Sequence, residues 1–408
     1  MAPSEIGLVT NNTNRFMPNT KSSRIQSIDL LRGLVMIIMA LDHVRDYFHF
    51  DAFFFDPMDL TQTTPLLFFT RFVTHFCAPV FIFLAGTSAF FVGQRKSKKE
   101  LSIWLLKRGL WLVIAEFTIL RFAWCFSLPT HGILLQVIWA LGISMIFLAG
   151  FIHLPKKSMI LTSLIAVFGH NLLDGIQPIG TFNIALWSFL HQFNIISISG
   201  FQLFIGYPII PWIFVMLLGY YFGSWYTPNY PQEFRTNKLL KLGIISTVLF
   251  FALRGLNQYG DPLPWTVYND TNLTILSFFN VNKYPPSLAY LLITMGPSFI
   301  FLSIAEKWNG LWTNRLAIIG RVPMFYYIVH IYVIHLFALF AALAMGFQAS
   351  NMVIPVWIGQ QTSLQGFGFS LGVVYLIWIT LVVALYPLSK WYDQYKQSHR
   401  HIWWLTYI

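Results

Sequence analysis

The chain has 408 residues, of which 56% are hydrophobic and only 10% are charged, whereas roughly one quarter of a soluble globular chain is charged. This composition excludes an ordinary soluble domain and indicates that lipid surrounds much of the protein. The formal net charge of +11 would suggest nucleic acid as the partner of a soluble protein, but here the Lys and Arg residues gather in alternate connections between apolar segments. We therefore expect a lipid bilayer, and no nucleic acid, as a partner.

The first 24 residues are polar and basic and lack apolar periodicity, as expected of a disordered tail. They also lack the short apolar core and small-residue cleavage site of a signal peptide. We expect this tail in the cytoplasm, one transmembrane domain over residues 25–393, and a second cytoplasmic tail over residues 394–408.

Ten apolar segments are long enough to cross a bilayer, because about twenty helical residues span its hydrocarbon layer. The sequence thus predicts an all-α, polytopic membrane protein. The predicted spans are 27–48, 67–93, 101–123, 132–152, 158–174, 208–226, 238–256, 286–305, 316–340 and 367–388.

Every second connection between these spans is basic, which predicts that both termini are cytoplasmic, since Lys and Arg near span ends stay on that side. The connections of opposite sidedness are long, poor in Lys and Arg, and expected outside. These are residues 175–207, 257–285 and 341–366. Within the first of them, residues 182–199 are apolar enough either to lie along the interface or to re-enter the membrane.

The first span carries several ionisable residues, which are costly in a membrane and therefore suggest function. Asp29 and Arg32 lie at its cytoplasmic end. Eleven residues, about three helical turns, separate Arg32 from His43, so both lie on one helix face. Asp29 and Arg32 can alternatively neutralise each other at a spacing of three.

A second ionisable group lies near the outer end of this span, where Asp42 and His43 are followed by Arg45 and Asp46. Histidine can accept and return a proton near neutral pH, and Asp42 or Asp46 could fix the tautomer of His43. A structural hydrogen bond is an alternative role for His43. A metal ligand is a weaker alternative, because the span offers no dedicated zinc spacing, and we expect no metal.

The second span places Arg71 and His75 four residues apart on one face, and Pro79 predicts a kink just after them. If the first two spans are antiparallel, His75 and His43 lie at similar depth and could share one cavity. The alternative is that His75 bonds to the backbone of a neighbouring helix.

The ninth predicted span repeats the arrangement of an inner Arg and an outer His with Arg321 and His335, which are fourteen residues apart. His330 points elsewhere and is expected to be structural. Lys283, in a connection otherwise poor in positive charge, suits an anionic or polar substrate, although it could equally serve as an interfacial anchor.

Several short runs of the sequence resemble the heparan-alpha-glucosaminide N-acetyltransferase family, part of the wider transmembrane acyltransferase superfamily, and in particular its bacterial members. The runs extend from the first span to the last. They are RIQSIDLLRG at residues 24–33, Asp42-His43, THFCAP at 74–79, FLAG at 83–86, KYPPSL at 283–288, GRVP at 320–323 and YPLSKWY at 386–392.

This resemblance implies a multi-pass enzyme of the bacterial inner membrane that transfers an acetyl group, or another acyl group, from cytosolic acyl-CoA to a hydroxyl or amine of an extracytoplasmic glycan or lipid-linked sugar. An Arg followed after ten residues by a His in the first span, as in Arg32 and His43, is also similar to acyltransferases that O-acetylate envelope glycans. The heparan enzyme differs, because it carries Asn at the position of His43 and places its catalytic His in the following loop, where this chain has only His49 nearby.

We therefore predict that His43 is the base, oriented by Asp42 and assisted by His75. Basic residues near the cytoplasmic face are expected to bind the CoA phosphates, and others to bind the acceptor. The first set is Arg32, with Asp29, Lys107, Arg108 and Arg321, and the second is Arg71, Lys283 and His335.

Four further questions stay open at this level. The buried Arg, Asp and His residues could instead form the path of a proton-coupled transporter of a glycan, lipid or small acid. The aromatic outer loops could belong to a module that only binds lipid-linked sugars. Acyl transfer could also proceed directly or through an acyl-histidine, and the chain could form a homodimer.

Overall fold

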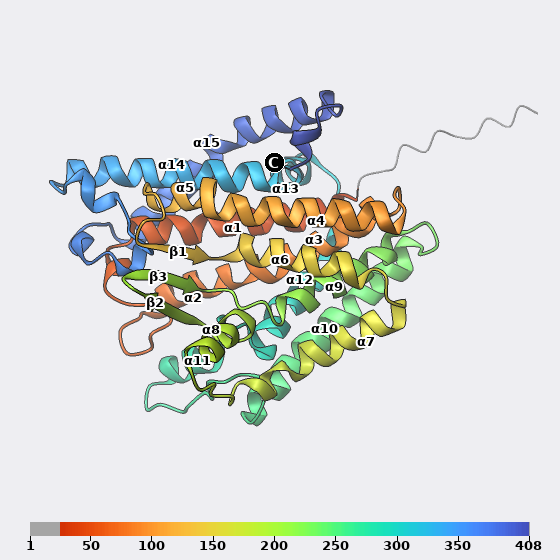
Figure 1. The fold of residues 1–408 in the computed structure, drawn as a ribbon, viewed down its shortest axis with the longest axis horizontal. Helices are drawn as coiled ribbons and strands as arrows, with labels where there is room; N and C mark the ends of the chain where they lie inside the picture. The colour runs from red at the N-terminus through yellow and green to blue at the C-terminus, as the bar shows by residue number, and fades with distance from the viewer. Residues whose placement is uncertain (1–24, 408) are drawn as a thin grey trace, which may run out of the picture.

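The computed structural model describes residues 25–407 and is mostly helical, with one small sheet near one end of the helix bundle (Figure 1). The predicted polar tail over residues 1–24 lies outside the described residues. The helices are α1 (Gln26–Phe48), α2 (Pro65–Val73), α3 (Cys77–Gly93), α4 (Lys98–Ala115), α5 (Arg121–Cys125), α6 (Val137–Phe151), α7 (Lys156–Gly169), α8 (Thr181–Leu190), α9 (Trp212–Phe222), α10 (Gln232–Leu256), α11 (Thr271–Phe279), α12 (Leu288–Ala305), α13 (Leu311–Arg321), α14 (Pro323–Ala344) and α15 (Leu371–Ser398).

Five helical segments among residues 25–407 are long and apolar enough to cross a membrane. They are Pro65–Gly93, which joins α2 to α3 through a short 3₁₀ turn, and helices α10, α12, α14 and α15. These segments make the chain a multi-pass membrane protein, while the ten predicted spans are not confirmed. Helix α1 has the length of a span, with 23 residues, but it carries too many charged side chains to count among these apolar segments.

The outer faces of several helices expose large apolar side chains, as lipid contact requires. On α15, Leu376 is 65% exposed and Val383 is 66% exposed. Within the most apolar 18-residue stretch of this helix, only 17% is buried inside the protein. Helix α15 continues to Ser398, past the predicted end of the transmembrane domain at residue 393.

A three-stranded sheet modifies the predicted all-α fold. Its strands are β1 (Gly132–Leu135), β2 (Asn194–Ile198) and β3 (Phe201–Ile205). The strand order is β1-β3-β2, with β1 parallel and β2 antiparallel to β3. The span predicted over residues 132–152 therefore begins as a strand, and its helix, α6, starts only at Val137. We call this end of the bundle the sheet end.

Helix α1 runs through the centre of the bundle and contacts α3, α12, α13, α14 and α15. Two glycines allow its close approach to α13. A Cβ on Gly320 would lie 1.9 Å from the carbonyl oxygen of Asp29, and a Cβ on Gly33 would lie 2.2 Å from that of Leu316. The backbone contact explains why both positions lack a side chain.

The span predicted over residues 316–340 is two helices, because α13 ends at Arg321 and α14 begins at Pro323. Proline lacks the N–H that would continue the helix and is favoured at the first helical position. Between the two helices, Val322 has φ −125° and ψ 47°. Helical phase therefore does not carry across this junction.

Candidate functional site

A cavity of about 380 Å³ opens at the sheet end, between the ends of the central helices and the sheet. Helix α1 contributes four closely spaced polar residues to the cavity wall. Helix α2 and the loop before α12 contribute one cation each, and β3 contributes an aromatic side chain. The members on which the chemistry depends are Asp42, His43, Arg45, Asp46, Arg71 and Lys283.

The carboxylates of this cavity are tied to two arginines. Arg71 Nη1 lies 2.5 Å from Asp42 Oδ2, and Arg45 Nη2 lies 2.9 Å from Asp42 Oδ1. Arg45 Nη2 also lies 2.5 Å from Asp46 Oδ1. Charged groups as buried as these need such partners, so α1 and α2 are locked together beside the cavity.

His43 is held by a second histidine rather than by Asp42 or Asp46. Its Nδ1 lies 2.8 Å from Nε2 of His330, and Nδ1 of His330 lies 2.7 Å from the carbonyl oxygen of Tyr326. A carbonyl oxygen only accepts, so His330 donates from Nδ1 and accepts at Nε2. His43 then donates from Nδ1, and its Nε2 carries a lone pair.

His330 and His335 lie on the same uninterrupted helix, α14, and point to different sides of it, as expected. The structure differs in which of the two reaches His43: it is His330, whereas His335 contacts backbone carbonyl oxygens away from the cavity. The cavity-side role of His330 left no signal in the sequence apart from its being a histidine in an apolar segment.

Aromatic side chains surround the imidazole of His43. The ring of Trp124, from α5, lies 4.7 Å from the His43 ring in an edge-on arrangement, and that of Tyr327 lies 5.9 Å away. Trp124 Nε1 donates to the hydroxyl of Tyr327 at 3.2 Å. These contacts restrict the orientation of His43 further.

Lys283 enters the cavity from a tight turn before α12, in which the Tyr284-Pro285 peptide bond is cis. Its Nζ lies 5.2 Å from the centroid of the Tyr284 ring. No carboxylate in the described part of the chain is in ion-pair contact with Lys283. Lys283 is thus the cavity cation whose charge is not already paired with an acid.

Asp261, which the sequence reasoning did not single out, anchors this turn. One of its oxygens accepts hydrogen bonds from the N–H of Asn282 at 3.0 Å and the hydroxyl of Ser287 at 2.7 Å. Burial raises the pKa of Asp261, whereas the nearby guanidinium of Arg254 opposes that rise. The turn therefore has a fixed shape before any substrate binds.

His75 is buried in the 3₁₀ turn Thr74–Phe76 and does not line the cavity. The predicted kink appears as this turn, since Pro79 cannot donate to the carbonyl oxygen of His75. The hydroxyl of Tyr290 donates to that oxygen instead, at 2.8 Å. The structure therefore does not bring His75 and His43 into one cavity.

His335 is also outside the cavity wall. Its Nδ1 and Nε2 lie 2.9 Å and 2.8 Å from the carbonyl oxygens of Ala123 and Met352, and its ring stacks on Phe126 at 3.7 Å. These contacts hold α14 to α5 and to the following loop. His49, in the region where the resemblance expects a catalytic His, is buried against Phe50.

Arg32 lies three turns from His43 on α1 and joins three helices. It contacts Asp29 at 3.1 Å, donates to the carbonyl oxygen of Gly320 on α13 at 3.1 Å, and donates to the hydroxyl of Ser88 on α3 at 3.0 Å. Because His43 reaches His330 on α14, both side chains turn toward the α13 and α14 segment. Arg32 itself is not part of the cavity wall.

The other residues predicted to bind CoA are dispersed. Arg321 forms an ion pair of 2.6 Å with Asp393 on α15. Arg108 lies over the rings of Trp104 and Tyr407, and Lys107 is exposed on α4.

A comparison with known protein families identifies the family of the chain. The family model of the heparan-alpha-glucosaminide N-acetyltransferase catalytic region matches residues 24–259, more than half of the chain. This match includes α1, α2 and β3, and most of the residues that line the cavity fall within the matched range. No curated protein matches the chain. The chain therefore belongs to the heparan-alpha-glucosaminide N-acetyltransferase catalytic family.

Proposed function

We propose that the chain is a membrane acyltransferase that transfers an acetyl group from acetyl-CoA to a hydroxyl or amine of an extracytoplasmic glycan or a related acceptor. Membership of the family implies an acetyltransferase that uses acetyl-CoA. The observation that carries the proposal is the hydrogen bond from His43 to His330 at a cavity large enough for part of a sugar and a thioester.

In this proposal His43 is the general base. The Tyr326 carbonyl oxygen fixes His330, and His330 fixes His43, so that Nε2 of His43 keeps its lone pair. A base must have its accepting atom free and held within hydrogen-bond reach of the proton that it removes. His330 is the positioning residue, because it acts on the substrate only through His43.

The transfer proceeds in two steps that balance. The acceptor oxygen or nitrogen attacks the thioester carbonyl carbon while Nε2 of His43 takes the acceptor proton, and the carbonyl electron pair moves onto oxygen. The tetrahedral intermediate then re-forms the carbonyl and breaks the carbon–sulfur bond. Protonated His43 returns its proton to the leaving thiolate, which departs as CoA.

Lys283 is the group proposed to bind negative charge in the cavity, either on the acceptor or on the developing oxyanion. This role is supported by the ion pairs of the cavity, because Asp42 and Asp46 pair with Arg45 and Arg71 and not with Lys283. A preorganised cation in a site with little water stabilises such charge strongly. Arg71 holds Asp42 and, at 3.5 Å, the hydroxyl of Tyr284, so it shapes the acceptor side.

The CoA donor is proposed to enter from the opposite end of α1, where Arg32 lies with Asp29 and, on α13, Arg321. The basic connections at 94–108, 235–241 and 307–315 support a cytoplasmic position for that end. The sheet end would then face outside, in the bacterial inner membrane. Lys107 and Arg108 are the further candidates for phosphate contacts on this side.

The experiment that tests this function is acetyl transfer by the purified chain in lipid nanodiscs, measured with radiolabelled acetyl-CoA and an envelope-glycan extract. His43→Ala should lower turnover by about 10²- to 10⁴-fold, the usual contribution of a general base. The matched control is His131→Ala, which removes an exposed histidine beside β1. Wild-type turnover in His43→Ala would refute the assignment.

The same preparation distinguishes an enzyme from a transporter. Proton-driven uptake of a glycan or small acid into proteoliposomes, without any acetyl transfer, would contradict the proposed function. Mass spectrometry of envelope glycans from cells with and without the protein should reveal the loss of an acetyl mass, and thereby identify the acceptor.

A further inference from the structure

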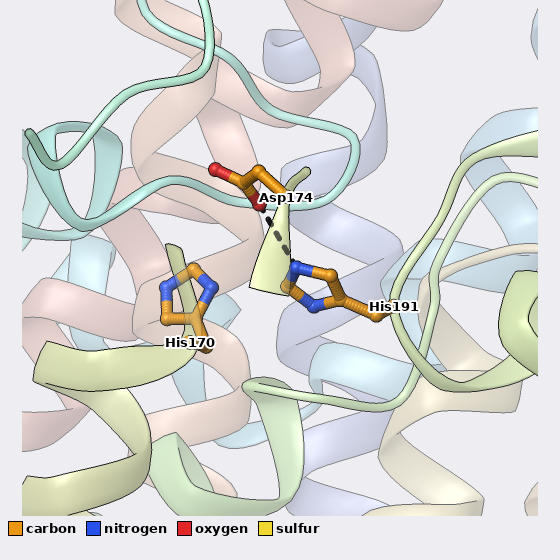
Figure 2. Close-up of side chains that lie close together, drawn as sticks. All are labelled: His170, Asp174 and His191. Carbon is orange, nitrogen blue, oxygen red and sulfur yellow. Dashed lines mark hydrogen bonds and ion pairs between the residues drawn. The ribbon is translucent and has the colours of Figure 1, made fainter. Parts of the chain in front are cut away.

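Two histidines and an aspartate from outside the cavity wall meet next to the end of α7. His170 lies in the 3₁₀ turn His170–Leu173, Asp174 follows that turn, and His191 directly follows α8. One ligand atom from each residue lies within 4.8 Å of the other two. Figure 2 shows the three side chains turned toward one another, with Asp174 and His191 joined by a contact of 2.9 Å.

Apart from Nε2 of His191, which contacts Asp174, the ring nitrogens of this group lack hydrogen-bond partners in the described part of the chain. His170 is only 2% exposed, and neither Nδ1 nor Nε2 has a hydrogen-bond partner; Nδ1 of His191, also 2% exposed, has none. A buried polar atom without a partner is costly, and each such case calls for an explanation. A metal ion bound at this point would satisfy one nitrogen of each imidazole.

Asp174 is held from outside, as a ligating carboxylate usually is. Asn171 Nδ2 donates to Asp174 Oδ2 at 2.7 Å, which leaves Oδ1 directed at His191. Asn171 Oδ1 accepts from the N–H of Leu288 at 2.9 Å. Hydrogen bonds of this kind fix the orientation of a ligating carboxylate.

We propose that His170, Asp174 and His191 bind a divalent transition-metal ion of the zinc class. Two imidazoles and one carboxylate are a donor set that Zn²⁺ accepts, at bonds of about 2.0–2.2 Å. Tetrahedral geometry places such donor atoms about 3.4 Å apart. Side-chain rotations that move the donor atoms by roughly an ångström would therefore bring the three into position. The fourth ligand position would be filled by water.

This site would connect the end of α7 to two segments next to the cavity. It joins the end of α7 to the end of α8, and His191 precedes by two residues Phe193, which lines the cavity. Through Asn171 it also reaches Leu288, the first residue of α12, directly after the turn that carries Lys283. A bound ion would therefore hold the cavity wall in place without contacting the substrate.

The test is metal binding by the full chain purified in detergent and stripped with a chelator. Inductively coupled plasma mass spectrometry should find one equivalent of Zn²⁺ per chain after incubation with Zn²⁺ and gel filtration. Co²⁺ added in its place should give visible d–d absorption. His170→Ala and Asp174→Asn should each reduce the bound metal to background, whereas His131→Ala, the exposed control, should bind like the wild type.

Asp174→Asn is the decisive variant, because Asn is nearly isosteric and keeps an oxygen that can accept from His191, but loses the charge. Zn²⁺ should raise the melting temperature of the wild type by several degrees and leave that of Asp174→Asn unchanged. Full metal binding by Asp174→Asn would overturn the proposal and indicate an adventitious ion only. Equally low metal binding by the wild type and all variants would also overturn it, and would leave an ordinary hydrogen bond between Asp174 and His191. These readouts involve no acetyl transfer, so they do not depend on the proposed function.

Discussion

Replacement of His330 by Ala is the sharpest probe of the histidine pair. The change removes the acceptor at 2.8 Å from Nδ1 of His43 while leaving His43 and the cavity cations in place. During the reaction His43 becomes a cation, and a hydrogen bond to a charged group contributes about 1.5–3 kcal/mol. Since each 1.36 kcal/mol is tenfold in rate, we expect kcat to fall by about 10- to 150-fold with little change in KM for acetyl-CoA.

The assay is initial-rate acetyl transfer in nanodiscs at several concentrations of acetyl-CoA. His330→Gln supplies an amide oxygen that can accept from His43, so it should recover part of the lost kcat. His335→Gln, on the same helix but with both ring nitrogens directed at carbonyl oxygens, is a control for general damage to α14. Equal activity of His330→Ala and the wild type, or equal loss in His330→Ala and His330→Gln, would refute the positioning role.

Two further predictions concern the cation of the cavity and the packing of α1. Lys283→Met should lower kcat/KM for the acceptor by about 10- to 150-fold, because it loses one hydrogen bond to a charged group. The control is Lys307→Met, which removes an exposed lysine and should leave kcat/KM unchanged. Equal values for the two variants in the acetyl-transfer assay would exclude Lys283 from substrate binding. Gly320→Ala should destabilise the protein by about 1–3 kcal/mol, because its Cβ would lie 1.9 Å from the Asp29 carbonyl oxygen. The control is Gly150→Ala, whose Cβ would meet nothing within 4 Å and should leave stability unchanged. Thermal unfolding in detergent measures both variants, and an unchanged melting temperature of Gly320→Ala would show that α1 and α13 do not pack as described.

Family membership and the membrane location could be reached from short sequence patterns. Long apolar segments report directly on the solvent of a helix, because a bilayer core tolerates few charges. The motif around Arg32 and His43 survives as a linear pattern because both residues lie on one uninterrupted helix, α1. For these features, local chain geometry is sufficient.

The small sheet could not be predicted by the same reasoning. Residues 132–135 are apolar and continue into the apolar residues of α6, so hydropathy does not separate strand from helix. Their strand conformation depends on hydrogen bonds to β3, about seventy residues further along the chain. Pairing at such a separation leaves no mark in a local window.

The sequence by itself determined that this is a membrane protein of an acetyltransferase family with Arg32 and His43 on one helix, because those features depend on composition and on neighbouring residues. Only the tertiary structure decided which charged or titratable side chains pair between different helices. It paired His43 with His330, Asp42 with Arg71, and Arg321 with Asp393. These partners come from different helices, and the break at Val322 alters the helical phase, so their meeting depends on how the helices pack and not on spacing along the chain.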